Sequence, residues 1–184
     1  MHVKPLVGTE LILGGARSGK SRLAEQLAEQ SGLIVKYVAT ATACDNEMAE
    51  RILSHKQQRP SQWMLIEEPY NLANIIREHS NNQTCLLIDC LTLWLNNCLF
   101  KPIGNHSWQQ AKADFLHAIS EAEGHIILVS NEVGQGIVPL GEVSRQFVDE
   151  SGWLHQAIAK QSARVIFVTA GIPQVLKGPT LSVT

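Results

Sequence analysis

The chain has 184 residues, of which 45% are hydrophobic, and this length suits one domain over residues 1–184 with a sizeable core. Its net charge of -2 and pI near 6.4 give no reason to expect nucleic acid, and no lysine or arginine run indicates an anionic membrane. The amino terminus lacks a long apolar segment, and the apolar stretch Cys85–Leu95 is broken by Asp89 and Thr92. We therefore expect a soluble cytoplasmic protein without a membrane anchor, whose partner is a small molecule.

The first strong pattern in chain order is a phosphate-binding loop of the form G-x-x-x-x-G-K-[ST]. The apolar run Leu11–Leu13 precedes it as a predicted strand, and Arg22–Gln30 follows it as a predicted helix. Backbone N–H groups and the helix amino terminus suit a phosphate, Lys20 reaches the β- and γ-phosphates, and the Ser21 hydroxyl is a ligand for Mg²⁺. We therefore predict a nucleoside triphosphate as the first ligand. The predicted loop consists of Gly14, Gly15, Ala16, Arg17, Ser18, Gly19, Lys20 and Ser21.

Apolar, β-branched runs recur along the rest of the chain, with helical stretches between most of them. This alternation predicts an α/β fold, in which a mainly parallel sheet is covered by helices on both faces and binds ligands at the carboxyl ends of its strands. Gln174–Lys177 follows a tight turn and is expected to form a short antiparallel edge strand. Met1–Thr9 has little pattern and is expected to fray. The predicted strands are Leu33–Ala39, Trp63–Ile66, Cys85–Ile88, His125–Val129 and Arg164–Thr169.

The apolar run Leu86–Ile88 ends in the carboxylate of Asp89. In P-loop enzymes an acid at the end of a neighbouring strand holds Mg²⁺ directly or through water, and Asp89 is the candidate here. The alternative is an N-cap for a predicted helix over Leu91–Leu99, and the two roles are compatible.

The four cysteines form no C-x-x-C pair. Cys85 and Cys90 lie in or next to the predicted strand that ends at Asp89, so we expect free core thiols.

The segment Asp45–Pro60 predicts a helix with an aspartate at its cap. Met48, Ile52 and His55 share one face of this helix at positions i, i+4 and i+7. A histidine on such a face is ordinarily a packing residue. Imidazole is also a competent nucleophile towards phosphorus, and the basic residues that follow would neutralise phosphate charge nearby. The spacing alone leaves both interpretations open.

The segment Ser130–Pro139 comes directly after the predicted strand His125–Val129 and contains two glycines and a polar triplet. Such a loop at the carboxyl end of a strand can approach a ligand closely, although an ordinary strand-to-helix connection uses the same residue types. Arg145, Phe147 and Asp149 follow on a predicted helix, where a solvated face accounts for them equally well.

Taken together, these motifs resemble one family, the bifunctional adenosylcobinamide kinase and adenosylcobinamide-phosphate guanylyltransferase of cobalamin biosynthesis. The resemblance runs from Leu11 to Lys177. It implies a RecA-like P-loop NTPase fold, Mg²⁺ as cofactor, GTP and ATP as substrates, and a homotrimer with the active site near a subunit boundary. The motifs that carry it are GGARSGKS, YVATA, EMAERI…HK..RP, LLIDCLT and SNEVGQGIVP, at residues 14–21, 37–41, 47–60, 86–92 and 130–139.

The resemblance also implies two reactions and their residues. With Lys20 at the triphosphate, the aminopropanol hydroxyl of adenosylcobinamide is phosphorylated. His55 then attacks the α-phosphorus of GTP and passes GMP to adenosylcobinamide phosphate, which gives adenosylcobinamide-GDP. If the nucleophile were another histidine, His125 or His155 would be next in line. Beyond the phosphate loop, the implied nucleotide contacts are Ala39, Thr40, Ala41, Lys56, Gln57, Gln58, Glu67 and Asp89.

The chain departs from the family pattern at three positions. Ser54 stands where some members have a second histidine, which leaves His55 as the candidate on this helix. Val148 and His155 stand where arginine and asparagine are expected. The sequence also identifies no base for the kinase step.

Two other functions stay open on the sequence. One is a monofunctional P-loop kinase for another small alcohol, in which His55 only packs, and the other is a non-catalytic nucleotide switch.

Overall fold

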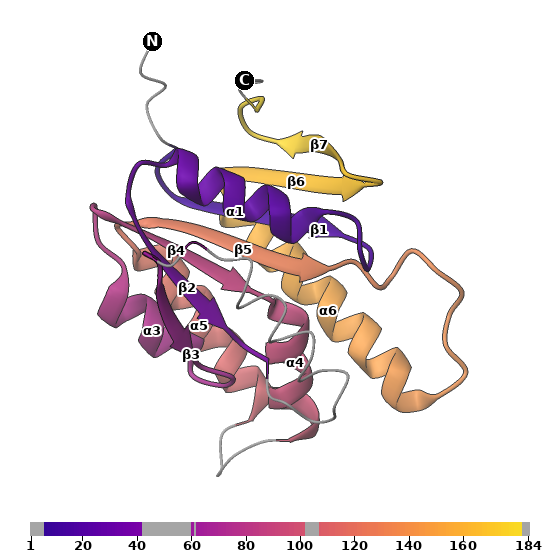
Figure 1. The fold of residues 1–184 in the computed structure, drawn as a ribbon. Coiled ribbons are helices and arrows are strands. Elements are labelled where there is room, and N and C mark those ends of the chain that lie inside the picture. The colour runs from indigo at the N-terminus through magenta and orange to yellow at the C-terminus, as the bar shows by residue number, and fades with distance from the viewer. Residues whose placement is uncertain (1–5, 42–59, 61, 102–106, 182–184) are drawn as a thin grey trace.

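The computed structural model describes residues 6–41, 60, 62–101 and 107–181, which form a seven-stranded sheet flanked by helices (Figure 1). The strand order is β3-β2-β4-β5-β1-β6-β7, so the first strand lies inside the sheet. The strands are β1 (Thr9–Gly14), β2 (Ile34–Ala39), β3 (Met64–Glu67), β4 (Thr84–Asp89), β5 (His125–Asn131), β6 (Arg164–Thr169) and β7 (Ile172–Lys177). The helices are α1 (Lys20–Gln30), α3 (Leu72–His79), α4 (Leu91–Phe100), α5 (Trp108–Glu121) and α6 (Glu142–Gln161).

Strands β1 to β6 pair in parallel, and β7 pairs antiparallel with β6 at the edge. Parallel neighbours need a crossover, whereas β6 and β7 are joined by a tight turn in which Ala170 and Gly171 both have positive φ. The predicted α/β class, the mainly parallel sheet and the antiparallel edge strand are therefore confirmed.

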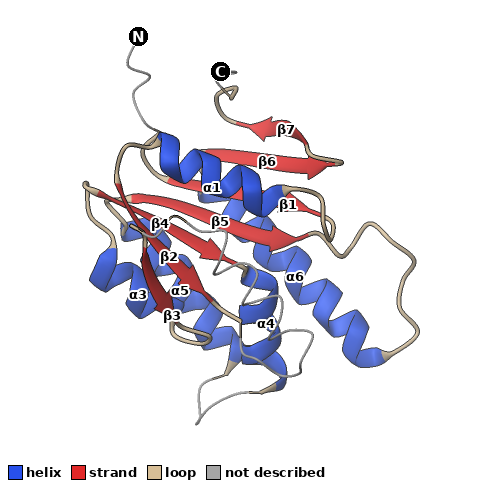
Figure 2. Cartoon of the chain, viewed as in Figure 1, coloured by secondary structure: helices blue, strands red, loops and turns tan. Residues whose placement is uncertain are grey.

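Helices cover both faces of the sheet (Figure 2). On one face α1 packs against β1, β4 and β5; below, this side is called the α1 face. The other face is covered by α3, α4, α5 and α6. Successive residues of β1 alternate between the two cores, with Ile12 on the α1 face and Leu11 and Leu13 on the other. The near-continuous apolar runs of the central strands follow from this burial on both faces.

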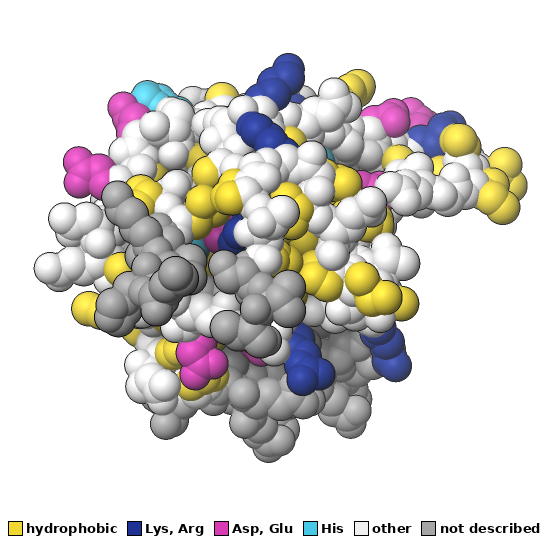
Figure 3. All heavy atoms as spheres, turned by 90° about the horizontal axis from the view of Figure 1, so that it is seen from above, with side chains coloured by type: hydrophobic (Ala, Val, Ile, Leu, Met, Phe, Trp, Pro, Cys, Tyr) yellow, Lys and Arg dark blue, Asp and Glu magenta, His cyan; other side chains and the backbone are white. Residues whose placement is uncertain are grey.

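One part of the chain projects from the body of the molecule. The loop of residues 132–141 and the first turns of α6 extend away from the sheet (Figure 1), and apolar side chains gather at the tip of this arm in the view from above (Figure 3). Ile137 and Leu140 are each 97% exposed. Below, residues 132–147 are called the arm.

Most sequence predictions of elements agree with the structure, and one is wrong. The prediction that Thr9 belongs to a fraying terminus fails, because Thr9 begins β1, pairs with β5 and is buried. The predicted helix over Asp45–Pro60 lies outside the described residues, apart from Pro60. Within the described ranges, no helix is both long and apolar enough to cross a membrane.

Candidate nucleotide-binding site

The phosphate-binding loop joins β1 to α1 at the carboxyl edge of the sheet, where the motif predicts it. Glycine is required at Gly14, because a Cβ there would lie 2.5 Å from the carbonyl oxygen of Val168 and 2.6 Å from Ser18 Oγ. Gly19 has φ +96°, and a Cβ there would meet the Cα of Gly171 at 3.2 Å. The loop is thus shaped by close backbone approaches as well as by its own turn.

Two neighbouring segments brace the loop through backbone hydrogen bonds. The N–H of Glu132, just past β5, donates to the Gly14 carbonyl at 3.0 Å, and the N–H of Gly171 donates to the Ser18 carbonyl at 2.8 Å. The second contact comes from the β6–β7 turn, which sequence reasoning did not connect with the loop. A glycine in a tight turn was the available signal, but its partner lies about 150 residues earlier in the chain.

Lys20 is a buried cation inside the loop. Its Nζ donates to the Gly15 carbonyl at 2.9 Å, which holds the ammonium against the backbone of the loop. Burial lowers the pKa of Lys20, and the negative charge of Asp89 opposes this shift. Ser18 Oγ is also buried, and among the described residues it has no hydrogen-bond partner. A buried ammonium and a free hydroxyl in one loop suit a phosphate group.

Asp89 ends β4 on the α1 face, the same side as the loop. Its Oδ2 accepts a hydrogen bond from the Tyr37 hydroxyl at 3.2 Å. The N-cap position of α4 is Cys90, and no side chain of the described residues caps this helix end. The capping alternative for Asp89 is therefore wrong: the chain passes from strand to helix so directly that Asp89 still belongs to the sheet.

Several sequence-predicted contacts lie in one row at the carboxyl edge. Ala39 is in register with Glu67 on one side and with Asp89 on the other, and Glu67 is exposed. The next residue, Thr40, is fully buried; its hydroxyl donates to the Cys90 carbonyl at 2.7 Å and accepts from the Cys90 N–H at 2.9 Å. Thr40 therefore ties β2 to the start of α4. The nucleotide contacts of Ala39, Thr40, Ala41 and Glu67 stay predictions.

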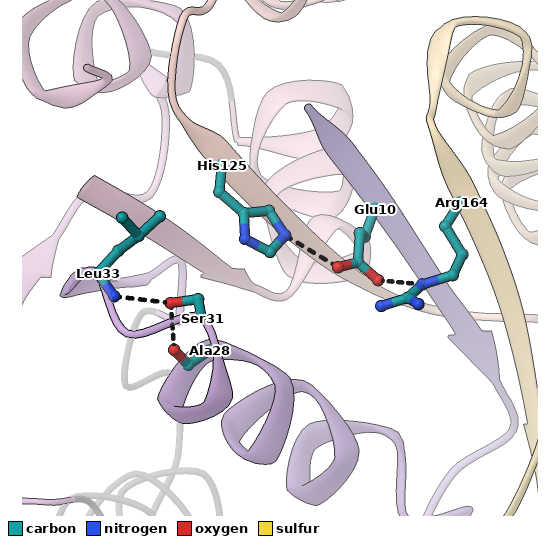
Figure 4. Close-up of polar contacts among 6 residues, drawn as sticks. All are labelled: Glu10, Ala28, Ser31, Leu33, His125 and Arg164. Carbon is teal, nitrogen blue, oxygen red and sulfur yellow. Dashed lines mark hydrogen bonds and ion pairs between the residues drawn. The ribbon is translucent and has the colours of Figure 1, made fainter. Parts of the chain in front are cut away.

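The predicted nucleophile His55 and its neighbours Lys56, Gln57 and Gln58 lie outside the described residues. The two alternative candidates for the nucleophile, His125 and His155, lie within the described residues. His125 begins β5 at the opposite, amino edge of the sheet, where its Nε2 contacts Glu10 at 2.9 Å (Figure 4). His155 lies on α6 with its Nε2 2.8 Å from Ser130 Oγ. The position of His125, far along the strand from the loop, argues against it as a nucleophile for a nucleotide bound there.

The described cysteines are free thiols, as the sequence predicts. Burial raises the pKa of Cys85 to about 12 and that of Cys90 and Cys98 to about 11. These thiols are protonated at neutral pH and are poor nucleophiles. Covalent chemistry at this site therefore calls for a residue other than these three cysteines.

The fold and the loop define a class: the chain is a P-loop nucleotide-binding α/β protein. Solved structures share the fold at low identity. The flagellar accessory protein FlaH from Methanocaldococcus jannaschii has a TM-score of 0.52 and 14% identity, covering 93% of this chain and 78% of that one. A protein of Pyrococcus horikoshii solved in a structural study has a TM-score of 0.53 and 12% identity, covering 94% and 87%.

Sequence comparison places the chain more narrowly. Residues 10–176 match the family model described as cobinamide kinase / cobinamide phosphate guanyltransferase, and the chain belongs to this family. It is 55% identical to the bifunctional adenosylcobalamin biosynthesis protein CobP of Pseudomonas aeruginosa, over 94% of this chain and 99% of that protein. It is 36% identical to the bifunctional adenosylcobalamin biosynthesis protein CobU of Escherichia coli, over 91% and 98%. The family resemblance that the sequence motifs indicate is confirmed.

Proposed function

We propose that this protein phosphorylates the aminopropanol hydroxyl of adenosylcobinamide and then transfers GMP from GTP to the product. The observation that carries the proposal is the complete phosphate loop, in which the buried Lys20 lies within the field of Asp89. Family membership gives the class of substrates, since its relatives carry the bifunctional name.

In the kinase step the loop supplies positioning and charge. Backbone N–H groups at the start of α1 and the Lys20 ammonium hold the triphosphate, while the alcohol oxygen attacks the γ-phosphorus and the bond to the nucleoside diphosphate breaks. Lys20 stabilises the negative charge on the transferring group. ATP and GTP both fit this description as donors.

Ser21 and Asp89 are the residues that would hold Mg²⁺, and their oxygen donors fit this hard cation. When bound, the ion neutralises charge on the β- and γ-phosphates. Among the described residues, no group of three histidine, cysteine or carboxylate side chains forms a metal cage. This agrees with a site in which substrate phosphates and water supply the other ligands.

In the guanylyl step we assign the nucleophile to His55. Its imidazole attacks the α-phosphorus, pyrophosphate leaves, and the phosphate of the kinase product takes GMP from the histidine. Imidazole suits both halves, because it is neutral enough to attack near pH 7 and leaves readily once guanylylated. We further assign nucleotide contacts to the phosphate loop and to Ala39, Thr40, Ala41, Lys56, Gln57, Gln58, Glu67 and Asp89.

We also propose that the protein is a single-domain homotrimer. The family resemblance motivates the assembly, and the exposed apolar side chains of the arm, such as Ile137 and Leu140, support a contact between copies. Sedimentation of the purified protein tests the trimer directly, and a monomer at micromolar concentration would contradict it.

The function is tested by following both reactions in one preparation. The protein is incubated with adenosylcobinamide and γ-labelled ATP or GTP, and separately with α-labelled GTP and Mg²⁺. We expect a phosphorylated corrinoid in the first assay and an acid-labile protein-bound label in the second. A phosphorylated alcohol without a protein adduct would favour a monofunctional kinase. The absence of both products would favour a nucleotide switch.

A further inference from the structure

A chain of polar side chains crosses from α4 through β5 to α6 beside the phosphate loop. Thr92 Oγ1 lies 3.3 Å from Ser130 Oγ, Ser130 Oγ lies 2.8 Å from His155 Nε2, and His155 Nδ1 lies 3.7 Å from Glu132 Oε2. Ser130 and His155 are buried. Below, these four residues are called the relay; none of them has a role in the two proposed reactions.

The hydrogen bonds that join Thr92, Ser130 and His155 run in one direction, towards Glu132. Glu132 is an acceptor when ionised, so the neutral imidazole of His155 meets it favourably with its proton on Nδ1. Nε2 then accepts from the Ser130 hydroxyl, whose oxygen accepts from Thr92; the Asn131 N–H donates to Thr92 Oγ1 at 2.8 Å. Burial lowers the pKa of His155 although the Glu132 carboxylate opposes the shift, which agrees with a neutral ring. In this assignment the Nδ1 proton of His155 faces the Glu132 carboxylate at 3.7 Å, an electrostatic contact that is longer than a hydrogen bond.

The relay ends at a carboxylate that is fixed next to the loop. Besides donating its N–H to Gly14, Glu132 accepts a hydrogen bond from the Gly134 N–H at 2.5 Å through Oε1. The side chain of Glu132 is 19% exposed, so the carboxylate is fixed by a hydrogen bond at Oε1, faces His155 Nδ1 at 3.7 Å through Oε2 and still reaches solvent. Pre-organised groups of this kind are typical of residues that act on a substrate.

Space for the alcohol that receives the phosphoryl group opens immediately beyond Glu132. A groove of about 280 Å³ begins at Val133 and Gly134 and runs between the loop of the arm and the first turns of α6, where Arg145 and Val148 also line it. This volume suits the aminopropanol group of the substrate, which carries the reacting hydroxyl, better than a whole corrinoid ring. Glu132 thus lies between the phosphate loop and a groove.

We propose that Glu132 is the base of the kinase step and that His155 is a positioning residue that orients it. The inference rests on the proposed kinase function and adds the missing proton acceptor. The acceptor O–H proton passes to a Glu132 carboxylate oxygen as the O–P bond forms, the bond between the γ-phosphorus and its bridging oxygen breaks, and the nucleoside diphosphate leaves. Asp89 faces the α1 side with Mg²⁺ as its assigned partner, so the two carboxylates have separate tasks.

The first test is Glu132→Gln, which keeps the size and a hydrogen-bond acceptor but not the base. We expect kcat of the kinase step to fall by roughly 10²- to 10⁴-fold, the usual contribution of a general base, while KM for ATP stays within about threefold. Formation of the GMP adduct with GTP should persist, because that step uses no acceptor alcohol. Kinase kcat within about threefold of the wild type overturns the inference.

The second test separates positioning from packing at His155. Asparagine places an amide N–H near the position of Nδ1, which faces Glu132, whereas glutamine places it near Nε2, which faces Ser130. His155→Asn should therefore keep kcat within about tenfold, and His155→Gln should lose at least tenfold more, with adduct formation intact in both. The matched controls are His117→Asn and His117→Gln, since the His117 side chain is 61% exposed and pairs only with Glu121 within its own helix among the described contacts.

Each outcome decides a different claim. Equal losses in the two His155 variants overturn the positioning role. If either variant fails to fold, as circular dichroism would show, the Glu132→Gln result alone decides whether the base is assigned correctly. A wild-type protein without kinase turnover overturns the proposed function itself, and the inference falls with it.

Discussion

Replacing Glu10 with glutamine is expected to destabilise the fold without affecting the nucleotide site. Glu10 is 1% exposed and lies at the amino edge of the sheet, where its carboxylate accepts from Arg164 Nε at 2.7 Å and contacts His125 Nε2 at 2.9 Å (Figure 4). Burial opposes ionisation of Glu10, but the hydrogen bonds from His125 and Arg164 outweigh it and lower its pKa. The carboxylate is therefore charged in the folded protein at neutral pH.

The loss of unfolding free energy is set by Arg164, which stays buried without its charged partner. Arg164 is itself buried, and removing one member of a buried ion pair costs about 3–5 kcal/mol because the other charge stays unpaired. Glutamine still offers a carbonyl to Arg164, so we expect the lower end, about 3 kcal/mol. For a chain of this size each kcal/mol lowers Tm by roughly 2–4 °C, which gives a drop of about 6–12 °C.

Thermal and urea unfolding of the two proteins measure this difference. The matched control is Glu121→Gln, whose carboxylate is 63% exposed and pairs with His117; it should change the free energy of unfolding by less than about 1 kcal/mol. Because the pKa of Glu10 is lowered on folding, its stabilising effect is complete above the unfolded pKa of about 4.3 and is lost as pH falls through the folded value. A Glu10→Gln loss below about 1 kcal/mol at pH 7, or one that grows as the pH falls below about 4, would refute this reasoning.

Three further predictions concern the site and the cysteines. Lys20→Ala should lower kinase turnover by roughly two or more orders of magnitude with near-normal unfolding, because a preorganised charge on the transferring group is lost; wild-type rates would remove Lys20 from the mechanism. Asp89→Asn should shift the Mg²⁺ dependence of turnover to higher concentration, and an unchanged titration would contradict a metal role. Because their raised pKa values keep Cys85, Cys90 and Cys98 protonated, these thiols should react slowly with iodoacetamide at pH 7 in the folded protein and fast in urea, as labelling followed by mass spectrometry would show.

The parts of the fold that the sequence predicts are those encoded by neighbouring residues. The β-branched runs of β4 and β5 identify buried strands because both faces of the sheet are covered, and the phosphate loop carries its glycines and lysine within eight residues. The edge strand β7 follows from the short turn at Gly171, which leaves no room for a crossover. In each case residues that are neighbours in the chain were sufficient to predict the element.

The features that sequence reasoning missed depend on partners far apart in the chain. Glu10 meets His125 and Arg164 at separations of 115 and 154 residues, and no pattern in one sequence pairs them. Thr40 is predicted to touch nucleotide, and its hydroxyl also meets Cys90, 50 residues away, which no motif indicates. Long-range polar contacts of this kind are set by strand order and register, which a motif does not state.

The central claim, that a histidine of this chain carries GMP, is tested most directly by intact-protein mass spectrometry after incubation with GTP and Mg²⁺. The wild-type protein should gain the mass of one GMP that acid removes, and His55→Asn should gain none while still folding and retaining part of its kinase activity. His117→Asn, which changes an exposed histidine, should gain the mass as the wild type does. Accumulation of protein-bound GMP in His55→Asn would contradict the account and place the nucleophile elsewhere.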